Sequence, residues 1–497
     1  MKQLQSLVCL FLTLGLLIGS VAFASAAPRN DVIIGVRLEP PHLDPTAGAA
    51  AAIGEVGYAN IFEGLTRIDR NGEVKPALAS SWDISPDGKN YVFFLQKGVL
   101  FHDGAPFSAE SVKFSFDRAR GDASVNPQKV LFEPIESIEV NDPATLTIRL
   151  KRPTGAFLFN LGWPAAVIVS AVSAENNKTN PIGTGPFIFK NWIRGASVEL
   201  QRNPAYWGKP VALERATIKF IADSSAAYTS LMAGDIDAFP IYPAPENLDQ
   251  FRSDPRFKVV IGNTEGKTIL AINNGKAPLN DIRVRQALAY AVDRKAIIDG
   301  AMFGIGQPIG SHYSPTSPGY IDLTGRYSYD PDRAKKLLLE AGIPKDFKLK
   351  LVLPPPEYAR RGGEIIASQL KQVGIDVEII PVEWAQWLSD VFKGRNYDLT
   401  IISHVEPLDL DIYARDDYYF DYHSPAYKAV ITELSATTDQ KKRLELIEKA
   451  QKILSEDCVN VFLFLLPKSG VWNANLTGLW ENVPIPVNDL TEIQWKK

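Results

Sequence analysis

The amino-acid sequence predicts an α/β protein built from more than one domain. Strand and helix patterns alternate along the chain, and the stretch 347–379 has the order strand, helix, strand. An earlier region, residues 82–95, has strand patterns only. The chain has 497 residues, of which 45% are hydrophobic, and this length suffices for about two to four domains with separate cores.

The first 26 residues have the layout of a secretory signal peptide. Lys2 precedes an apolar run over 7–23, and Ala24-Ser25-Ala26 offers small residues at positions −3 and −1 of a cleavage site after Ala26. The alternative is a membrane anchor, but the polar residues 28–31 follow at once. No later apolar run reaches about 18 residues. We therefore expect an exported, periplasmic protein that is soluble once the signal is removed.

A β-hairpin is predicted in the early part of the chain. Pro86-Asp87-Gly88 separates Trp82-Asp83-Ile84 from a run in which Tyr91, Phe93 and Leu95 alternate with their neighbours. Pro, Asp and Gly are the residues that turns prefer, so this region is expected to be a smaller, β-rich part of the protein.

Two helices are predicted from their start and stop residues. Asp281 is placed to cap a helix with apolar residues at helical spacing up to Val292. Asp330-Pro331 opens a second helix, and Gly342 closes it.

A βαβ unit follows directly. Alternating leucines after Phe347 predict a strand, 362–373 predicts a helix that stops at Gly374, and 375–379 alternates again. Two strands joined by a helix are parallel, so the core sheet is expected to be partly parallel.

The residues that could carry reaction chemistry do not form a known catalytic pattern. The net charge is −4 and no basic run is present, so a nucleic-acid partner is not expected. The sequence has no Gly-x-Ser-x-Gly, His-Glu-x-x-His, Cys-x-x-Cys or Gly-x-x-x-x-Gly-Lys motif. His404 and Glu406 would share one face of a strand, but two ligands are too few for a closed metal site. Cys458, the only cysteine after the signal, is expected to be a buried thiol. We predict no catalytic residue, no metal and no cofactor.

Several long segments, in order, resemble solute-binding family 5, the extracytoplasmic receptors of peptide/nickel-type ABC importers. The strongest are PALASSWDISPDG at 76–88, YVFFL at 91–95, FHDG at 101–104 and SAESVKFSFD at 108–117. Further along come GTGPF at 183–187, NPAYWG at 203–208, LMAGDID at 231–237 and DIRVRQALAYAVDR at 281–294. The resemblance covers nearly all of residues 30–470.

The resemblance implies a type II periplasmic binding protein, similar to cluster C, in which two lobes joined by a hinge close on a ligand and an extra domain lies beside the first lobe. Carried onto this chain, lobe I takes 27–70, 180–270 and 467–497, the extra domain takes 71–179, and lobe III takes 271–466. The implied function is capture of a small polar solute and its delivery to an ABC permease in the inner membrane, by a monomer. Peptide, opine, sugar derivative and chelated metal all remain candidates for the solute.

Binding residues are carried over by position. Trp384 matches the Trp of a Glu-Trp motif that lines the pocket in peptide receptors of the family. After the strand Tyr397-Asp398-Leu399, His404 stands where a Trp is usual, and either Glu406 or Asp409 matches an acidic residue that pairs with a peptide's amino terminus. The loop that contains Thr46 and Ala49, and the turn 183–187, are expected to offer backbone donors to the solute.

The alternative function class is a secreted hydrolase acting in the same cleft. It would need a nucleophile or paired carboxylates there.

Overall fold

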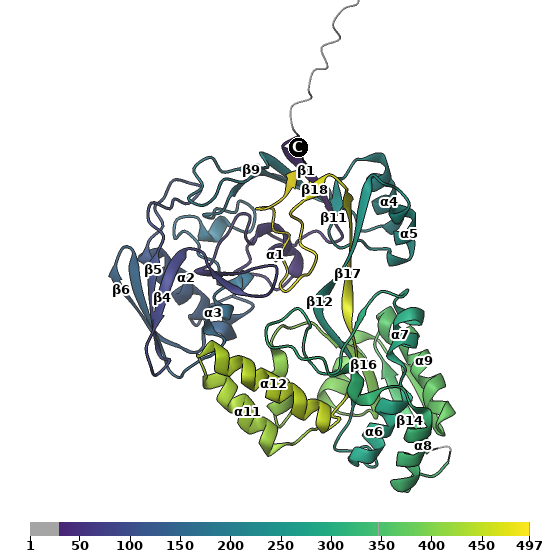
Figure 1. Cartoon of the computed structure of the whole chain (residues 1–497). Helices are drawn as coiled ribbons and strands as arrows, with labels where there is room; N and C mark the ends of the chain where they lie inside the picture. The colour runs from purple at the N-terminus through teal and green to yellow at the C-terminus, as the bar shows by residue number, and fades with distance from the viewer. Residues whose placement is uncertain (1–28, 346, 497) are drawn as a thin grey trace, which may run out of the picture.

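The computed structural model describes residues 29–345 and 347–496, so the expected signal peptide lies outside the described residues. Two halves of the molecule lie one above the other in Figure 1, and the strands β12 and β17 run between them. A smaller sheet with its helices lies beside the upper half. Among the described residues, no helix combines the length and the apolar character needed to cross a membrane.

One sheet of 11 strands extends through both halves. Its first part, in the upper half, contains β8 (Phe187–Ile193), β9 (Ser197–Arg202), β10 (Arg215–Phe220), β1 (Asp31–Val36) and β11 (Ala238–Phe239). Its second part, in the lower half, contains β16 (Leu399–His404), β14 (Phe347–Leu353), β15 (Ile375–Pro381) and β13 (Gln307–Pro308). We call these two parts the first and the second half-sheet.

A two-stranded ribbon joins the half-sheets. It consists of β12 (Phe257–Ile272) and β17 (Val461–Asn473), which pair antiparallel along most of their length. The register is interrupted between Asn263 and Lys267, where β12 passes from one half of the molecule to the other. The ribbon is therefore irregular at 264–266.

The second half-sheet confirms the predicted βαβ unit. β14 and β15 pair in parallel, and α9 (Glu357–Gln372) connects them before Gly374, whose φ is 89°. β16 also pairs in parallel with β14. Buried clusters cover both faces of this half-sheet. The other helices of the lower half are α6 (Ile282–Ala291), α7 (Arg294–Ala301), α8 (Pro331–Glu340), α11 (Pro425–Ala436) and α12 (Gln440–Glu456).

The predicted Asp281 cap is present, and Asp330 at the predicted start of the second helix is a cap as well. The Asp281 carboxylate accepts from the amide of Arg283 at 2.8 Å, and the Asp330 carboxylate accepts from the amide of Arg333 at 2.9 Å. Cys458 is buried as expected, and burial raises the pKa of its thiol to about 12.

The predicted hairpin belongs to a separate four-stranded antiparallel sheet. Its order is β4 (Ala79–Ile84), β5 (Asn90–Leu95), β7 (Thr145–Leu150) and β6 (Ile135–Asp142). Gly88 takes the left-handed turn conformation with φ of 67°, which glycine adopts without strain. The helix α2 (Ala109–Arg120) and the short α3 (Phe157–Asn160) contribute to its core. We call this region the small sheet.

The remaining elements are short. The upper half has α1 (Ala51–Gly57), α4 (Ser224–Ala233), α5 (Leu248–Arg252), the pair β2 (Thr66–Ile68) and β3 (Val74–Pro76), and the pair β18 (Leu476–Thr477) and β19 (Gln494–Trp495). In the lower half, α10 (Trp384–Gln386) continues as a π-helical turn over Trp387–Lys393, and a 3₁₀ turn spans Asp409–Ala414.

Candidate functional site

The carboxyl ends of three parallel strands meet at one edge of the second half-sheet. β14, β15 and β16 end there, at Leu353, Pro381 and His404. His404 pairs with Lys267, next to the irregular segment 264–266, whereas Leu399 at the other end of β16 pairs with Ile272. This edge therefore faces the upper half. Ligand sites of open α/β sheets form at such carboxyl ends, where loops rather than strands present side chains.

Trp384 lies at this edge, directly after β15, and 42% of it is exposed. Its ring meets that of Trp387 edge to face at 5.9 Å. Trp387 is buried, and its indole nitrogen donates to Thr400 Oγ1 at 3.0 Å. Trp387 thus anchors the turn while Trp384 projects from it. Leu388 and Val405 are exposed as well, so the edge presents apolar side chains.

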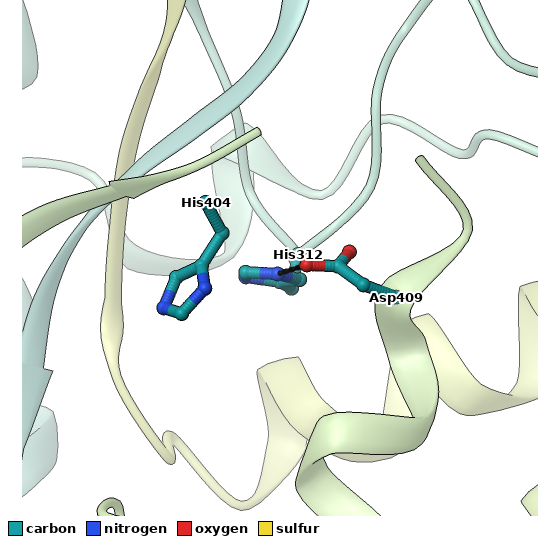
Figure 2. Close-up of side chains that lie close together, drawn as sticks. All are labelled: His312, His404 and Asp409. Carbon is teal, nitrogen blue, oxygen red and sulfur yellow. Dashed lines mark hydrogen bonds and ion pairs between the residues drawn. The ribbon is translucent and has the colours of Figure 1, made fainter. Parts of the chain in front are cut away.

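His404 is buried at the end of β16, where its Nε2 lies 2.9 Å from the Tyr419 hydroxyl. Burial, with smaller contributions from the nearby His312 and Lys267, lowers the pKa of His404 to about 3. The imidazole is therefore neutral at pH 7. Figure 2 shows His312 between His404 and Asp409.

Asp409 is buried and already paired within the lower half. Its Oδ1 lies 2.7 Å from Lys267 Nζ, and its Oδ2 lies 3.1 Å from His312 Nε2. Burial alone would raise the pKa of Asp409, but Lys267 and His312 lower it well below its ordinary value. The carboxylate is therefore ionised, and its charge is balanced by Lys267.

His312 belongs to a chain of hydrogen bonds that runs from Asn460 through Tyr413 to Asp409. Asn460 Nδ2 donates to the Tyr413 hydroxyl at 3.1 Å, and that hydroxyl lies 3.0 Å from His312 Nδ1. If Tyr413 donates to Nδ1, then the His312 proton is on Nε2 and faces Asp409. We call Lys267, His312, His404 and Asp409 the buried network.

Donor atoms of His312, His404 and Asp409 lie within 4.8 Å of one another, close enough in principle for a metal ion. Both nitrogens of His312 already have partners, and the Lys267 ammonium occupies the Asp409 carboxylate. A divalent cation would have to displace that ammonium. The arrangement fits a hydrogen-bonded charge network better than a metal centre.

Glu406 lies in the loop between His404 and Asp409, and its side chain is exposed. Its main-chain carbonyl accepts from Lys267 Nζ, so Lys267 holds this loop at two points, Glu406 and Asp409. Within residues 29–345 and 347–496, no ion pair of the Glu406 carboxylate is found. Of the two acidic candidates, Glu406 is the one whose carboxylate is available to a solute.

Thr46 and Ala49 lie in the upper half. Thr46 is buried, and its amide and hydroxyl both donate to Asp44 Oδ1, at 2.8 and 2.6 Å. Arg118 also donates to the Thr46 hydroxyl at 2.9 Å. Ala49 is exposed just before α1. Thr46 and Ala49 therefore lie apart from the other four candidates, which are at the carboxyl-end edge of the second half-sheet: Trp384, His404, Glu406 and Asp409.

The turn 183–187 packs against the main chain of 60–62. The amides of Gly185 and Phe187 donate to the carbonyls of Ile61 and Asn60, both at 2.9 Å. A Cβ on Gly183 would lie 1.9 Å from the Ile61 oxygen, so only glycine fits there. The amides of Gly185 and Phe187, which the sequence suggested as donors to a solute, are therefore used inside the protein.

A cavity of about 530 Å³ lies beside the 404–409 loop. The small sheet and its helices line one side, the lower half lines another, and Glu265 of the ribbon lines it between them. A volume of this size accommodates a small ligand. Its main lining residues are Trp82, Tyr91, Leu158, Phe159, Glu265, Tyr313, Ser317, Pro407, Leu408, Arg443, Leu444 and Ile447.

Sequence reasoning identified the 404–409 loop but missed Lys267, His312 and Glu265. A lysine and a glutamate two residues apart on a long strand could have suggested two charges on one face, because strand residues i and i+2 share a face.

Comparisons with known proteins agree with the resemblance found in the sequence. The family model of bacterial extracellular solute-binding proteins, family 5 (middle), matches residues 73–411. The dipeptide-binding protein of Escherichia coli is 29% identical over 489 residues, with 90% of this chain and 91% of that protein covered. The heme-binding protein A of Haemophilus influenzae is 29% identical over 424 residues, with 77% of each chain covered.

Solved structures show the same architecture. The periplasmic binding protein DppA from Helicobacter pylori in complex with the peptide STSA is 27% identical, has a TM-score of 0.74, and covers 95% of this chain and 99% of its own. The unliganded open form of the murein tripeptide binding protein MppA, 23% identical, has a TM-score of 0.85 and covers 94% of this chain and 97% of its own.

Proposed function

Because this chain belongs to family 5 of the bacterial extracellular solute-binding proteins, we propose that it captures a small, amino-acid-derived solute such as a short peptide between its two halves. Its fold is that of a type II periplasmic binding protein, as expected from the sequence. The chain is a solute-binding receptor of an ABC importer rather than a secreted hydrolase. The observation that carries the choice of solute is the exposed Glu406 carboxylate, which lies at the same edge as the exposed Trp384, the edge that faces the upper half.

We propose the division of the chain that the resemblance implies. Lobe I comprises 27–70, 180–270 and 467–497, the extra domain 71–179, and lobe III 271–466. The position of the ribbon supports this division to within a few residues, because β12 and β17 cross between the halves near 264–266 and 466–467, which places 267–270 with the lower half. We further propose a periplasmic location after cleavage at Ala26, a monomeric state, and an inner-membrane ABC permease as the partner.

In this proposal the site residues have different roles. The exposed Trp384 packs against the solute, and Glu406 pairs with its ammonium group. His404 and Asp409 are positioning residues, because both are buried and hold the loop that carries Glu406. Thr46 and Ala49 belong to the opposite wall, which reaches the solute when the lobes close.

Substituting Glu406 by Gln should weaken binding of the dipeptide Ala-Ala by at least about tenfold, because removing one partner of a desolvated charge pair leaves the other unpaired. Isothermal calorimetry measures this change. The matched control is Asp411→Asn, an exposed acid of the same segment that pairs with Arg415 instead. We expect the control to bind like the parent. Equal weakening in both variants would contradict a specific role for Glu406, and no binding by the parent would overturn the peptide proposal.

Binding should also close the lobes. A solute that touches both walls stabilises the closed state by its differential affinity for that state. Small-angle X-ray scattering of the protein with saturating Ala-Ala should therefore give a smaller radius of gyration than without it. An unchanged radius at saturation would contradict closure.

A further inference from the structure

The cavity beside the 404–409 loop contains a buried carboxylate that the proposed function does not use. Glu265 lies in the irregular segment of β12 and is 6% exposed. Its carboxylate accepts from the hydroxyls of Ser317 at 3.2 Å and Thr316 at 3.4 Å. Both hydrogen bonds are long, and both donors are uncharged hydroxyl groups. In the part of the chain that the structure describes, Glu265 makes no ion pair.

Lys267, a cation on the same strand, does not neutralise Glu265. Lys267, two residues further along β12, is 2.7 Å from Asp409 and also donates to the Glu406 carbonyl. Burial raises the pKa of Glu265, and the attraction of Lys267 and the hydroxyls of Ser314 and Ser317 oppose this only in part. A buried carboxylate without a counter-ion is costly, and a cationic group entering the cavity would remove that cost.

The walls around Glu265 suit a cation on an apolar chain. Trp82, Tyr91 and Phe159 contribute aromatic rings from the side of the small sheet, and Leu444 and Ile447 contribute aliphatic groups from α12. Aromatic faces attract cations, while the aliphatic groups accept an alkyl chain.

Two other charged residues line the cavity. Glu73 is exposed and pairs with Lys75. Arg443 lies on the α12 wall, where its Nη1 donates to the carbonyls of Leu434 and Thr437, both at 3.0 Å. Glu265 is therefore the one buried acid among the lining residues, and Arg443 is held on a different wall.

We propose that this cavity is a subsite for a cationic side group of the solute, an ammonium on a flexible alkyl chain, with Glu265 as its counter-ion. This inference rests on the proposed function, since the cavity extends from Pro407 and Leu408 of the loop that carries Glu406. A cation bound there contacts the small sheet, the ribbon and lobe III together.

The test compares two dipeptides that differ in the ammonium alone, Ala-Lys and Ala-norleucine, by calorimetry. The parent should bind Ala-Lys at least about tenfold more tightly. Glu265→Gln should abolish this preference and leave Ala-norleucine affinity unchanged, because the glutamine oxygen can still accept from Ser317 and Thr316. Glu73→Gln, which changes the exposed acid of the same cavity, should keep the preference. Thermal unfolding establishes that each variant is folded.

The outcomes separate this inference from the proposed function. If both dipeptides bind equally, or if Glu265→Gln keeps the preference, the subsite is refuted while peptide binding stands. If neither binds, the peptide proposal fails, and ligand-observed NMR with n-pentylammonium and 1-pentanol decides the subsite alone. Binding of the ammonium only, lost in Glu265→Gln, would support it. Equal signals from both probes, or none from the ammonium, would overturn it.

Discussion

Substituting Lys267 by methionine should lower the free energy of unfolding of the lower half by about 3–5 kcal/mol, because the Asp409 carboxylate would remain buried without its cation. Lys267 is 1% exposed, so methionine replaces its alkyl stem but not its ammonium. The 404–409 loop would also lose the donor to the Glu406 carbonyl. Urea unfolding measures the change, and hydrogen exchange of β12 and β16 localises it.

The control for this experiment is Lys428→Met, which removes a lysine that pairs with Asp416 on the surface. We expect the control to unfold like the parent. Adding Asp409→Asn to Lys267→Met should recover part of the lost stability, because the second change removes the stranded charge and keeps an acceptor for His312. A double variant less stable than the single one would show that the loss has another cause.

Acid should destabilise the protein through the buried histidines, and His404→Gln should reduce this effect. The pKa of His404 is about 3 in the folded protein, against an ordinary value of 6.5. Above pH 6.5 the imidazole is neutral in both states. As the pH falls below 6.5 towards 3, the unfolded chain binds a proton that the folded protein does not, so stability decreases by about 1.4 kcal/mol per pH unit.

Between pH 6.5 and about pH 4.5 the parent should therefore lose about 2–3 kcal/mol more stability than His404→Gln does. Urea unfolding at several pH values gives both slopes, and contributions from other groups cancel in the difference. The pKa of His312 is also lowered by burial, so part of the acid sensitivity should remain in the variant. The exposed His423, changed to Gln, serves as control. If the unfolding free energy of His404→Gln depended on pH as strongly as that of the parent, the conclusion that His404 is buried as a neutral imidazole would be contradicted.

Much of the fold could be predicted from the sequence because its signals are local. The Asp281 cap bonds an amide two residues away, and the left-handed Gly88 lies in the turn that it closes. The periodicity of 347–379 predicts the βαβ unit, whose two strands and helix follow one another directly in the sequence. Burial of Cys458 follows from the apolar run that contains it.

The candidate site was predicted only in part, and the missing part depends on long-range pairing. The sequence pointed to Trp384 and to the loop with Glu406, but it left Glu406 and Asp409 equivalent. The structure separates them because the register of β12 against β16 places Lys267 opposite His404. Lys267 thereby lies beside Asp409, although the two residues are 142 positions apart in the sequence.

What the sequence by itself determined is the set of local elements, the absence of a catalytic motif, and the loop that carries the candidate binding residues. Only the tertiary structure decided which charges are already neutralised inside the protein and which are available to a solute. Helix caps, turns and periodicity depend on neighbours within a few residues, whereas the state of a buried carboxylate depends on whichever cation the sheet brings beside it. Asp409 receives Lys267, Glu265 receives only hydroxyl groups, and that difference arises from strand register rather than from any local pattern.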